Sequence, residues 1–174
     1  MTKKLDKKKI QSAIENLDYD WSQYTFDNFV SHIEKLRERP MVIVPLPYLK
    51  VPAVCTATEI SDYIIYDASD IPMSQHHHKL HELGHFILGH VQEVLATDDL
   101  ENFLQEIRSK SLFRGYSHIY ERDLGVEHEA EYFAYKVEDD IADARRLNQI
   151  TGLPVPPNWQ VPPFYGTSSE QEKQ

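Results

Sequence analysis

The chain has 174 residues, of which 41% are hydrophobic, so it is long enough for one ordinary domain with a buried core. Its 18 basic and 28 acidic residues give a formal net charge of −10, which disfavours direct nucleic-acid binding and favours basic protein partners. A single cysteine excludes an internal disulfide, and no apolar run reaches the roughly 18 residues of a membrane span. The basic N-terminus is followed by no apolar stretch, so we expect no secretory signal and a cytoplasmic location.

Hydrophobic periodicity predicts two amphipathic helices at the start of the chain. The first spans residues 7–17. The second begins after Thr25, which is expected to be its N-cap, and ends at Pro40. Three short strands are then expected, the last two forming a hairpin, at residues 41–44, 51–56 and 63–66.

Three helices are predicted in the second half of the chain. Ser74 is expected to be the N-cap of a helix that runs to about His90, and a further helix spans residues 99–108. A long helix is expected over residues 125–147. Its inner face repeats apolar residues at helical spacing: Val126, Ala130, Phe133, Ala134, Val137 and Ile141.

Residues 1–150 are predicted to form one domain, and the composition changes after it. Residues 151–166 are rich in proline, which favours extended backbone. Because this extension also carries Trp159, Phe164 and Tyr165, we expect it to dock on the domain or on a partner. Residues 167–174 are polar and are predicted to be a disordered tail.

The strongest chemical signal is His81-Glu82-Leu83-Gly84-His85. Two histidines four residues apart on a helix point to one side, which suits two ligands of one Zn²⁺ ion. Glu82 lies one step round the helix, where a general base can take a proton from water. The alternative is a solvated helix start, because three further histidines (residues 76–78), expected at the surface, precede the motif. His90 is expected to be a cap or surface group.

Zinc needs a third protein ligand, and the best candidates lie on the long helix. Glu127 and Glu131 are four residues apart and share a face, so one can bind the metal while the other orients a ligand histidine. Glu129 points to a different side and is the alternative third ligand. A solvated acidic helix face would explain the same residues without a metal.

The sequence from His81 to His90, HELGHFILGH, is followed by EHEAEYFA from Glu127 to Ala134. This pair of motifs resembles the ImmA/IrrE metallopeptidases, whose pattern is a HELGH-like motif and, some tens of residues later, E-x-E/Q-A-N-x-F-A. The resemblance covers roughly residues 20–145. Many zinc peptidases share the first motif, whereas the pair in this order and spacing is much more specific.

The resemblance implies an α+β, zincin-like domain of gluzincin type, with a short, mostly antiparallel sheet packed against the motif helix and a second long helix. It also implies a zinc endopeptidase that cleaves helix-turn-helix repressors, with His81, His85 and Glu127 as metal ligands and Glu82 as base. Two departures stand out. Glu131 replaces the asparagine of the pattern, and residues 135–140 replace a leucine-rich stretch that often ends in Met-Pro.

Two rival functions remain on the sequence alone. The domain could sense or bind a partner through a zinc site without proteolysis, or zinc could be structural, with His90 or His128 closing the fourth position. The intact Glu82 favours catalysis, because a structural site has no use for a base. Several side chains are available to stabilise an oxyanion, and the sequence does not choose among them: Tyr116, His118, Tyr120 and Tyr132.

Overall fold

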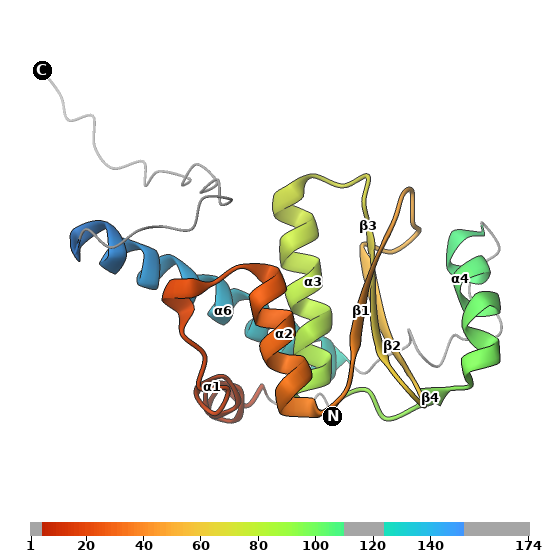
Figure 1. Ribbon diagram of the computed structural model, residues 1–174, viewed down its shortest axis with the longest axis horizontal. Helices are drawn as coiled ribbons and strands as arrows, with labels where there is room; N and C mark the ends of the chain where they lie inside the picture. Colours follow the sequence, from red (N-terminus) through yellow and green to blue (C-terminus); the bar gives the residue numbers. More distant parts are fainter. Residues whose placement is uncertain (1–4, 110–123, 152–174) are drawn as a thin grey trace, which may run out of the picture.

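The computed structural model describes residues 5–109 and 124–151. The fold is α+β: two helices come first, three consecutive strands follow, and the rest of the described chain is mainly helical (Figure 1). In chain order the elements are α1 (Lys7–Glu15), η1 (Trp21–Gln23), α2 (Phe26–Arg37), β1 (Met41–Leu46), β2 (Ala53–Thr58), β3 (Asp62–Asp67), α3 (Pro72–Ile87), β4 (Val94–Leu95), η2 (Thr97–Asp99), α4 (Leu100–Arg108) and α6 (Leu124–Thr151).

The strands form one four-stranded mixed sheet in the order β1-β3-β2-β4. The predicted hairpin is confirmed, because β2 and β3 are antiparallel, with Cys55 opposite Ile64. The prediction of a mostly antiparallel sheet is wrong, since β1 pairs with β3 in parallel and β2 pairs with β4 in parallel. The reason is that β3 returns between β1 and β2, which places the apolar pair Ile64 and Ile65 at the buried centre of the sheet.

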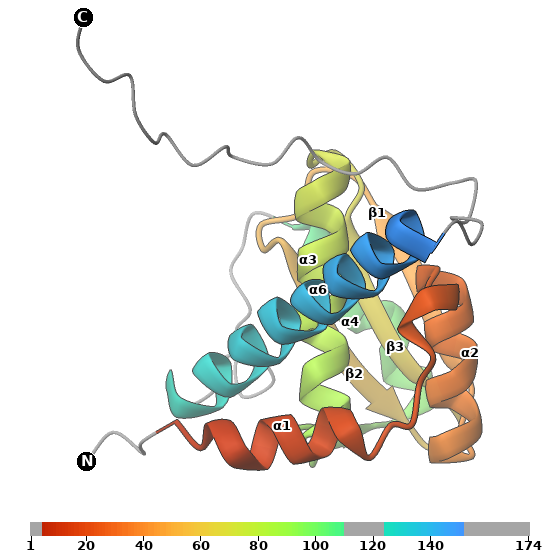
Figure 2. The ribbon, with the colours of Figure 1, turned by 90° about the vertical axis from the view of Figure 1, so that its left-hand side faces the viewer.

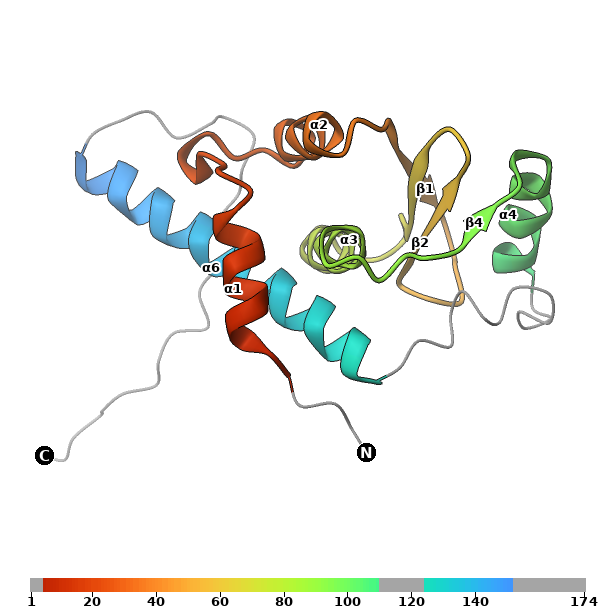
Figure 3. The same cartoon turned by 90° about the horizontal axis from the view of Figure 1, so that it is seen from below.

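Helices cover both faces of this sheet. Figures 1 and 3 show α3 and α2 on one side and α4 on the other. Side chains alternate along each strand, so Ile64 packs toward α3 while Ile65 packs toward Phe103 and Ile107 of α4. The fold therefore has a small core under α4 and a larger core around α3.

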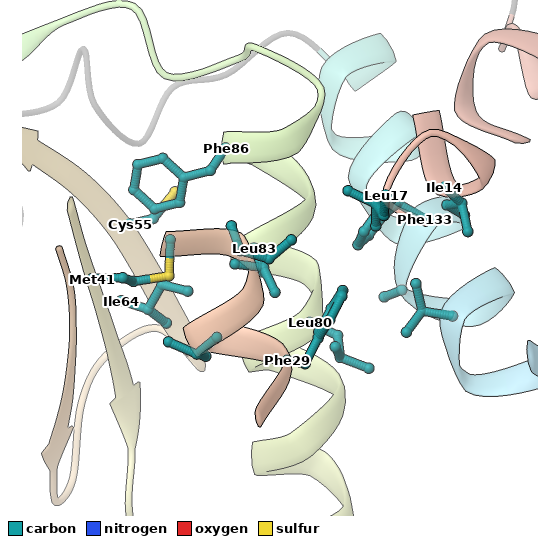
Figure 4. Close-up of a cluster of buried hydrophobic side chains, with 14 of the residues drawn as sticks. Ile14, Leu17, Phe29, Met41, Cys55, Ile64, Leu80, Leu83, Phe86 and Phe133 are labelled. Carbon is teal, nitrogen blue, oxygen red and sulfur yellow. The ribbon is translucent and has the colours of Figure 1, made fainter. Parts of the chain in front are cut away.

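The larger core explains why α3 is central. Leu80 and Leu83 of α3 lie between sheet residues such as Cys55 and Phe133 of α6 (Figure 4), and all four are fully buried. In Figure 2, α6 crosses α3, and α1 packs along the first half of α6. The motif helix is thus packed on several sides by the sheet, α2 and α6.

Helix boundaries follow local chemistry. Thr25 caps α2, as predicted, and its hydroxyl accepts a hydrogen bond from the Asn28 amide. The prediction that Ser74 caps α3 is wrong, because the helix begins two residues earlier, at Pro72. Proline suits the first helical position, where its fixed φ is helical and its missing N–H is not needed. No helix among the described residues has the length and apolar character to cross a membrane.

The crossing of α3 and α6 is close because residue 84 is a glycine. A Cβ atom built on Gly84 would lie 2.8 Å from Cδ1 of the fully buried Phe133. This contact brings the backbone of α6, which carries Glu127 and Glu131, close to the histidines of α3. Gly84 therefore sets the spacing between the two helices that build the site.

We expect Gly84→Ala to destabilise the protein by about 1 kcal/mol. Alanine adds about 1 kcal/mol of helix propensity, but overpacking a buried contact typically costs about 1–3 kcal/mol. The contact here is with the fully buried Phe133. Urea unfolding measures the difference. In a Phe133→Leu background the same substitution should be neutral or stabilising, and an equal loss in both backgrounds would refute the steric explanation.

Candidate metal centre

Three predicted ligands come together where α3 and α6 cross. Nε2 of His81 lies 3.1 Å from Oε2 of Glu127, and Nε2 of His85 lies 3.4 Å from Oε1 of the same carboxylate. The two Nε2 atoms are themselves 3.1 Å apart. One ligand atom from each residue thus lies within 4.8 Å of the others, although His81 and Glu127 are 46 positions apart in the sequence.

The donor set fits a divalent cation. Two imidazole nitrogens and one carboxylate oxygen converge on one point, and His85 is completely buried. Neutral imidazoles crowded against each other gain little from hydrogen bonds alone, whereas a cation would satisfy all three lone pairs. His81, His85 and Glu127 could therefore hold a metal ion.

Glu131 lies in the position expected for orienting a ligand. Its Oε2 is 3.0 Å from Nδ1 of His81, the ring nitrogen that faces away from Glu127. The same oxygen lies 3.3 Å from Nε2 of His77, whose Nδ1 is 3.1 Å from Glu138. The hydrogen bond to Glu138, together with the charge of Glu131, raises the pKa of His77. A protonated His77 would donate to both carboxylates and hold Glu131 against His81.

The pKa of Glu131 follows from the same contacts. Burial opposes ionisation of its carboxyl group, but the hydrogen bonds from His81 and His77 outweigh burial and lower the pKa. Glu131 is therefore ionised at neutral pH. Its carboxylate accepts a hydrogen bond from Nδ1–H of His81, which leaves Nε2 of that ring with its lone pair for a metal.

Glu129, the alternative third ligand, lies outside this group. Its Oε2 accepts hydrogen bonds from Nζ of Lys9, 3.1 Å away, and from Nε2 of His90, 3.2 Å away. Burial opposes ionisation, but Lys9 and His90 together lower the pKa of Glu129. The geometry therefore favours Glu127 as the third ligand and gives Glu129 different partners.

His90 is neither a cap nor a surface group, contrary to the sequence analysis. Its side chain is 6% exposed, and its Nδ1 lies 3.1 Å from Nδ1 of His85. Gly89 ends α3 in the left-handed conformation (φ +73°), and the His90 amide then donates to the carbonyl of His85. This Schellman turn folds His90 back over the last turn of the helix, onto His85, the second candidate metal ligand.

Glu82, the residue predicted to be the base, follows His81 on α3. It is buried, with 6% of its surface exposed, and it is adjacent in sequence to His81. Burial opposes protonation of His81, but the hydrogen bond to Glu127 and the charge of Glu82 are strong enough to raise its pKa. Glu82 is therefore close enough to act electrostatically on the candidate centre.

Other predicted residues lie elsewhere. The prediction that His76, His77 and His78 are surface residues is wrong: all three are half-buried, because α3 is packed on several sides. Burial lowers the pKa of His76 to about 4, beside the hydroxyl of Tyr24. His128 is exposed and does not join the ligand group, and the ring of Tyr132 packs under Lys7 of α1.

Several predictions lie outside the described residues. They concern the oxyanion candidates Tyr116, His118 and Tyr120, the proline-rich extension from residue 152 on, and the C-terminal tail.

Comparison of the chain with protein-family models, curated proteins and solved structures returns no match.

Proposed function

We propose that this protein is a zinc-dependent endopeptidase. The observation that carries the proposal is the convergence of His81, His85 and Glu127 within 4.8 Å, with the buried Glu82 next to them in the motif. Two histidines and one carboxylate on helices are a ligand set typical of catalytic zinc. The same residues carry the resemblance to the ImmA/IrrE metallopeptidases.

The donor atoms favour zinc over other cations. Imidazole nitrogen suits zinc well, whereas magnesium and calcium prefer oxygen ligands. Three protein ligands leave one tetrahedral position for water, and His90 and His128 do not join the group as a fourth ligand. When bound, the ion would lower the pKa of water and polarise a peptide carbonyl.

The protein's own groups supply the remaining chemistry. Glu82 takes a proton from the attacking water and later gives it to the leaving amine, the two roles of a general base and acid. Glu131 and His90 hold the second ring nitrogens of His81 and His85, so both rings present Nε2 to the centre. A domain that only bound a partner would not need Glu82.

The substrate class follows from the resemblance and from charge. We propose a helix-turn-helix transcriptional repressor, whose cleavage would induce its regulon or mobile element. Repressors are basic where they face phosphate, and a protein with a net charge of −10 attracts such a surface. The one cysteine, buried in β2, suits the reducing cytoplasm in which such regulators work.

A capture experiment tests the substrate. The Glu82→Gln protein, which should bind but not cleave, is used as bait in an extract of its own cell at rising salt. We expect it to retain a helix-turn-helix regulator, less strongly at high salt because electrostatic attraction is screened. We also expect the wild-type protein to cleave that purified regulator.

Three results would contradict this account of the substrate. Repeated capture without any transcription regulator would remove the proposed substrate class. Binding of DNA by this chain alone would contradict the argument from charge. Capture of a regulator that the wild-type protein leaves intact would instead favour a sensing module that acts by contact.

A further inference from the structure

We propose that His90 and Glu129 are positioning residues that fix the tautomer of His85, so that its Nε2 lone pair faces the metal centre. The inference rests on the proposed metal site. It adds residues that belong to neither the HExxH motif nor the ligand set. It also explains why a third histidine and a buried acid accompany the motif.

A continuous series of hydrogen bonds joins α3, α6 and α1. Nδ1 of His85 lies 3.1 Å from Nδ1 of His90, Nε2 of His90 lies 3.2 Å from Oε2 of Glu129, and Nζ of Lys9 lies 3.1 Å from the same oxygen. The side chains of His85, His90 and Glu129 are 0%, 6% and 4% exposed. Little water can therefore replace these hydrogen bonds.

The carboxylate of Glu129 determines which ring nitrogens of His90 and His85 carry a hydrogen. An ionised Glu129 can only accept, so Nε2 of His90 must carry the hydrogen. A neutral His90 then has a lone pair on Nδ1, which can only accept from Nδ1–H of His85. The Nε2 of His85 is left without a hydrogen, as a metal ligand requires.

The position of these hydrogen bonds argues against Glu129 as a ligand of the same metal ion. The two nitrogens of an imidazole ring point in different directions, and Glu127 lies on the Nε2 side of His85 while His90 lies on the Nδ1 side. Glu129 therefore acts on the centre through His90. Lys9, from α1, supplies the positive charge beside the carboxylate.

The experiment reads the tautomer and the metal affinity separately. Proteins with ¹⁵N-labelled histidines are studied by NMR in the metal-free form, and zinc affinity is measured by competition with a chromophoric chelator. The variants are Glu129→Gln, His90→Phe and His90→Gln, which keeps a hydrogen-bond acceptor. His128→Phe is the matched control, because this histidine is exposed on α6.

We expect His85 of the wild-type protein to carry its proton on Nδ1. Glu129→Gln should allow the other tautomer, because an amide can donate as well as accept, and should weaken zinc binding about 10- to 100-fold. His90→Phe should weaken it to a similar extent, while His90→Gln recovers most of the affinity and His128→Phe changes nothing. Glu129→Gln alters few atoms, so it tests the role of these hydrogen bonds even if the His90→Phe protein does not fold.

Two outcomes would overturn the inference. One is a wild-type His85 protonated on Nε2, and the other is unchanged zinc affinity and tautomer in both Glu129→Gln and His90→Phe. Failure of the proposed function looks different. In that case the wild-type protein binds no zinc. The NMR spectra of the metal-free proteins still show whether Glu129 determines the tautomer of His85.

Discussion

Glu82→Gln is expected to abolish proteolysis while zinc stays bound. The amide cannot take a proton from water, and loss of a general base typically lowers the rate about 10²- to 10⁴-fold. Zinc should remain, because the three proposed ligand atoms belong to His81, His85 and Glu127 and not to Glu82. Cleavage of the captured regulator and metal content, measured on the same preparation, give both results.

The matched control is Glu101→Gln. This glutamate is exposed on α4, which lies on the far side of the sheet from α3 (Figure 1). The Glu101→Gln protein should cleave the substrate as the wild-type protein does. Equal cleavage by the Glu82→Gln and wild-type proteins would show that Glu82 is not the base.

We expect the wild-type protein to hold about one zinc ion per chain and His81→Ala to lose most of it. Even residues that only orient a ligand change metal affinity about 10- to 100-fold, so loss of a ligand should weaken binding by more than about 100-fold. Glu127→Gln should also weaken binding more than Glu129→Gln, because only Glu127 faces both Nε2 atoms. Chelator competition on all three variants and the wild-type protein measures the order.

Two results would contradict this ligand assignment. A His81→Ala protein as fully loaded as the wild-type protein would place the zinc elsewhere. A larger loss of affinity for Glu129→Gln than for Glu127→Gln would exchange the roles of the two glutamates. Unfolding curves of each variant distinguish lost affinity from lost structure.

The sequence predicted those features that depend on neighbours in the chain. The spacing of His81 and His85 on a helix, the cap at Thr25 and the hairpin of β2 and β3 all follow from local patterns. The grouping of Glu127 with the two histidines is a long-range contact. It was expected from the face that Glu127 shares with Glu131 and from the register of the second motif.

Long-range contacts account for what the sequence did not predict. The parallel pairing of β1 with β3 depends on which strand is buried at the centre of the sheet. His77 shares a face with His81, four residues on, but its role appears only once α6 brings Glu131 and Glu138 against it. Glu129 and Lys9 meet across 120 positions, which no local pattern encodes.

The position of His90 could have been predicted, because a local signal for it is present in the sequence. Glycine directly after a helix is typical of a Schellman turn, which folds the next residue back over the last turn. The order Gly89-His90 therefore places a histidine near His85, five residues earlier. From the sequence, His90 was expected only to be a cap, a surface group or a fourth ligand.

Anomalous X-ray diffraction at the zinc edge, from crystals of the wild-type protein, would locate the metal and its ligands. We expect one zinc ion about 2.0–2.2 Å from Nε2 of His81, Nε2 of His85 and a carboxylate oxygen of Glu127, with no fourth protein ligand. An anomalous peak elsewhere, or a zinc ion closed by a fourth side chain such as His90, would contradict this expectation.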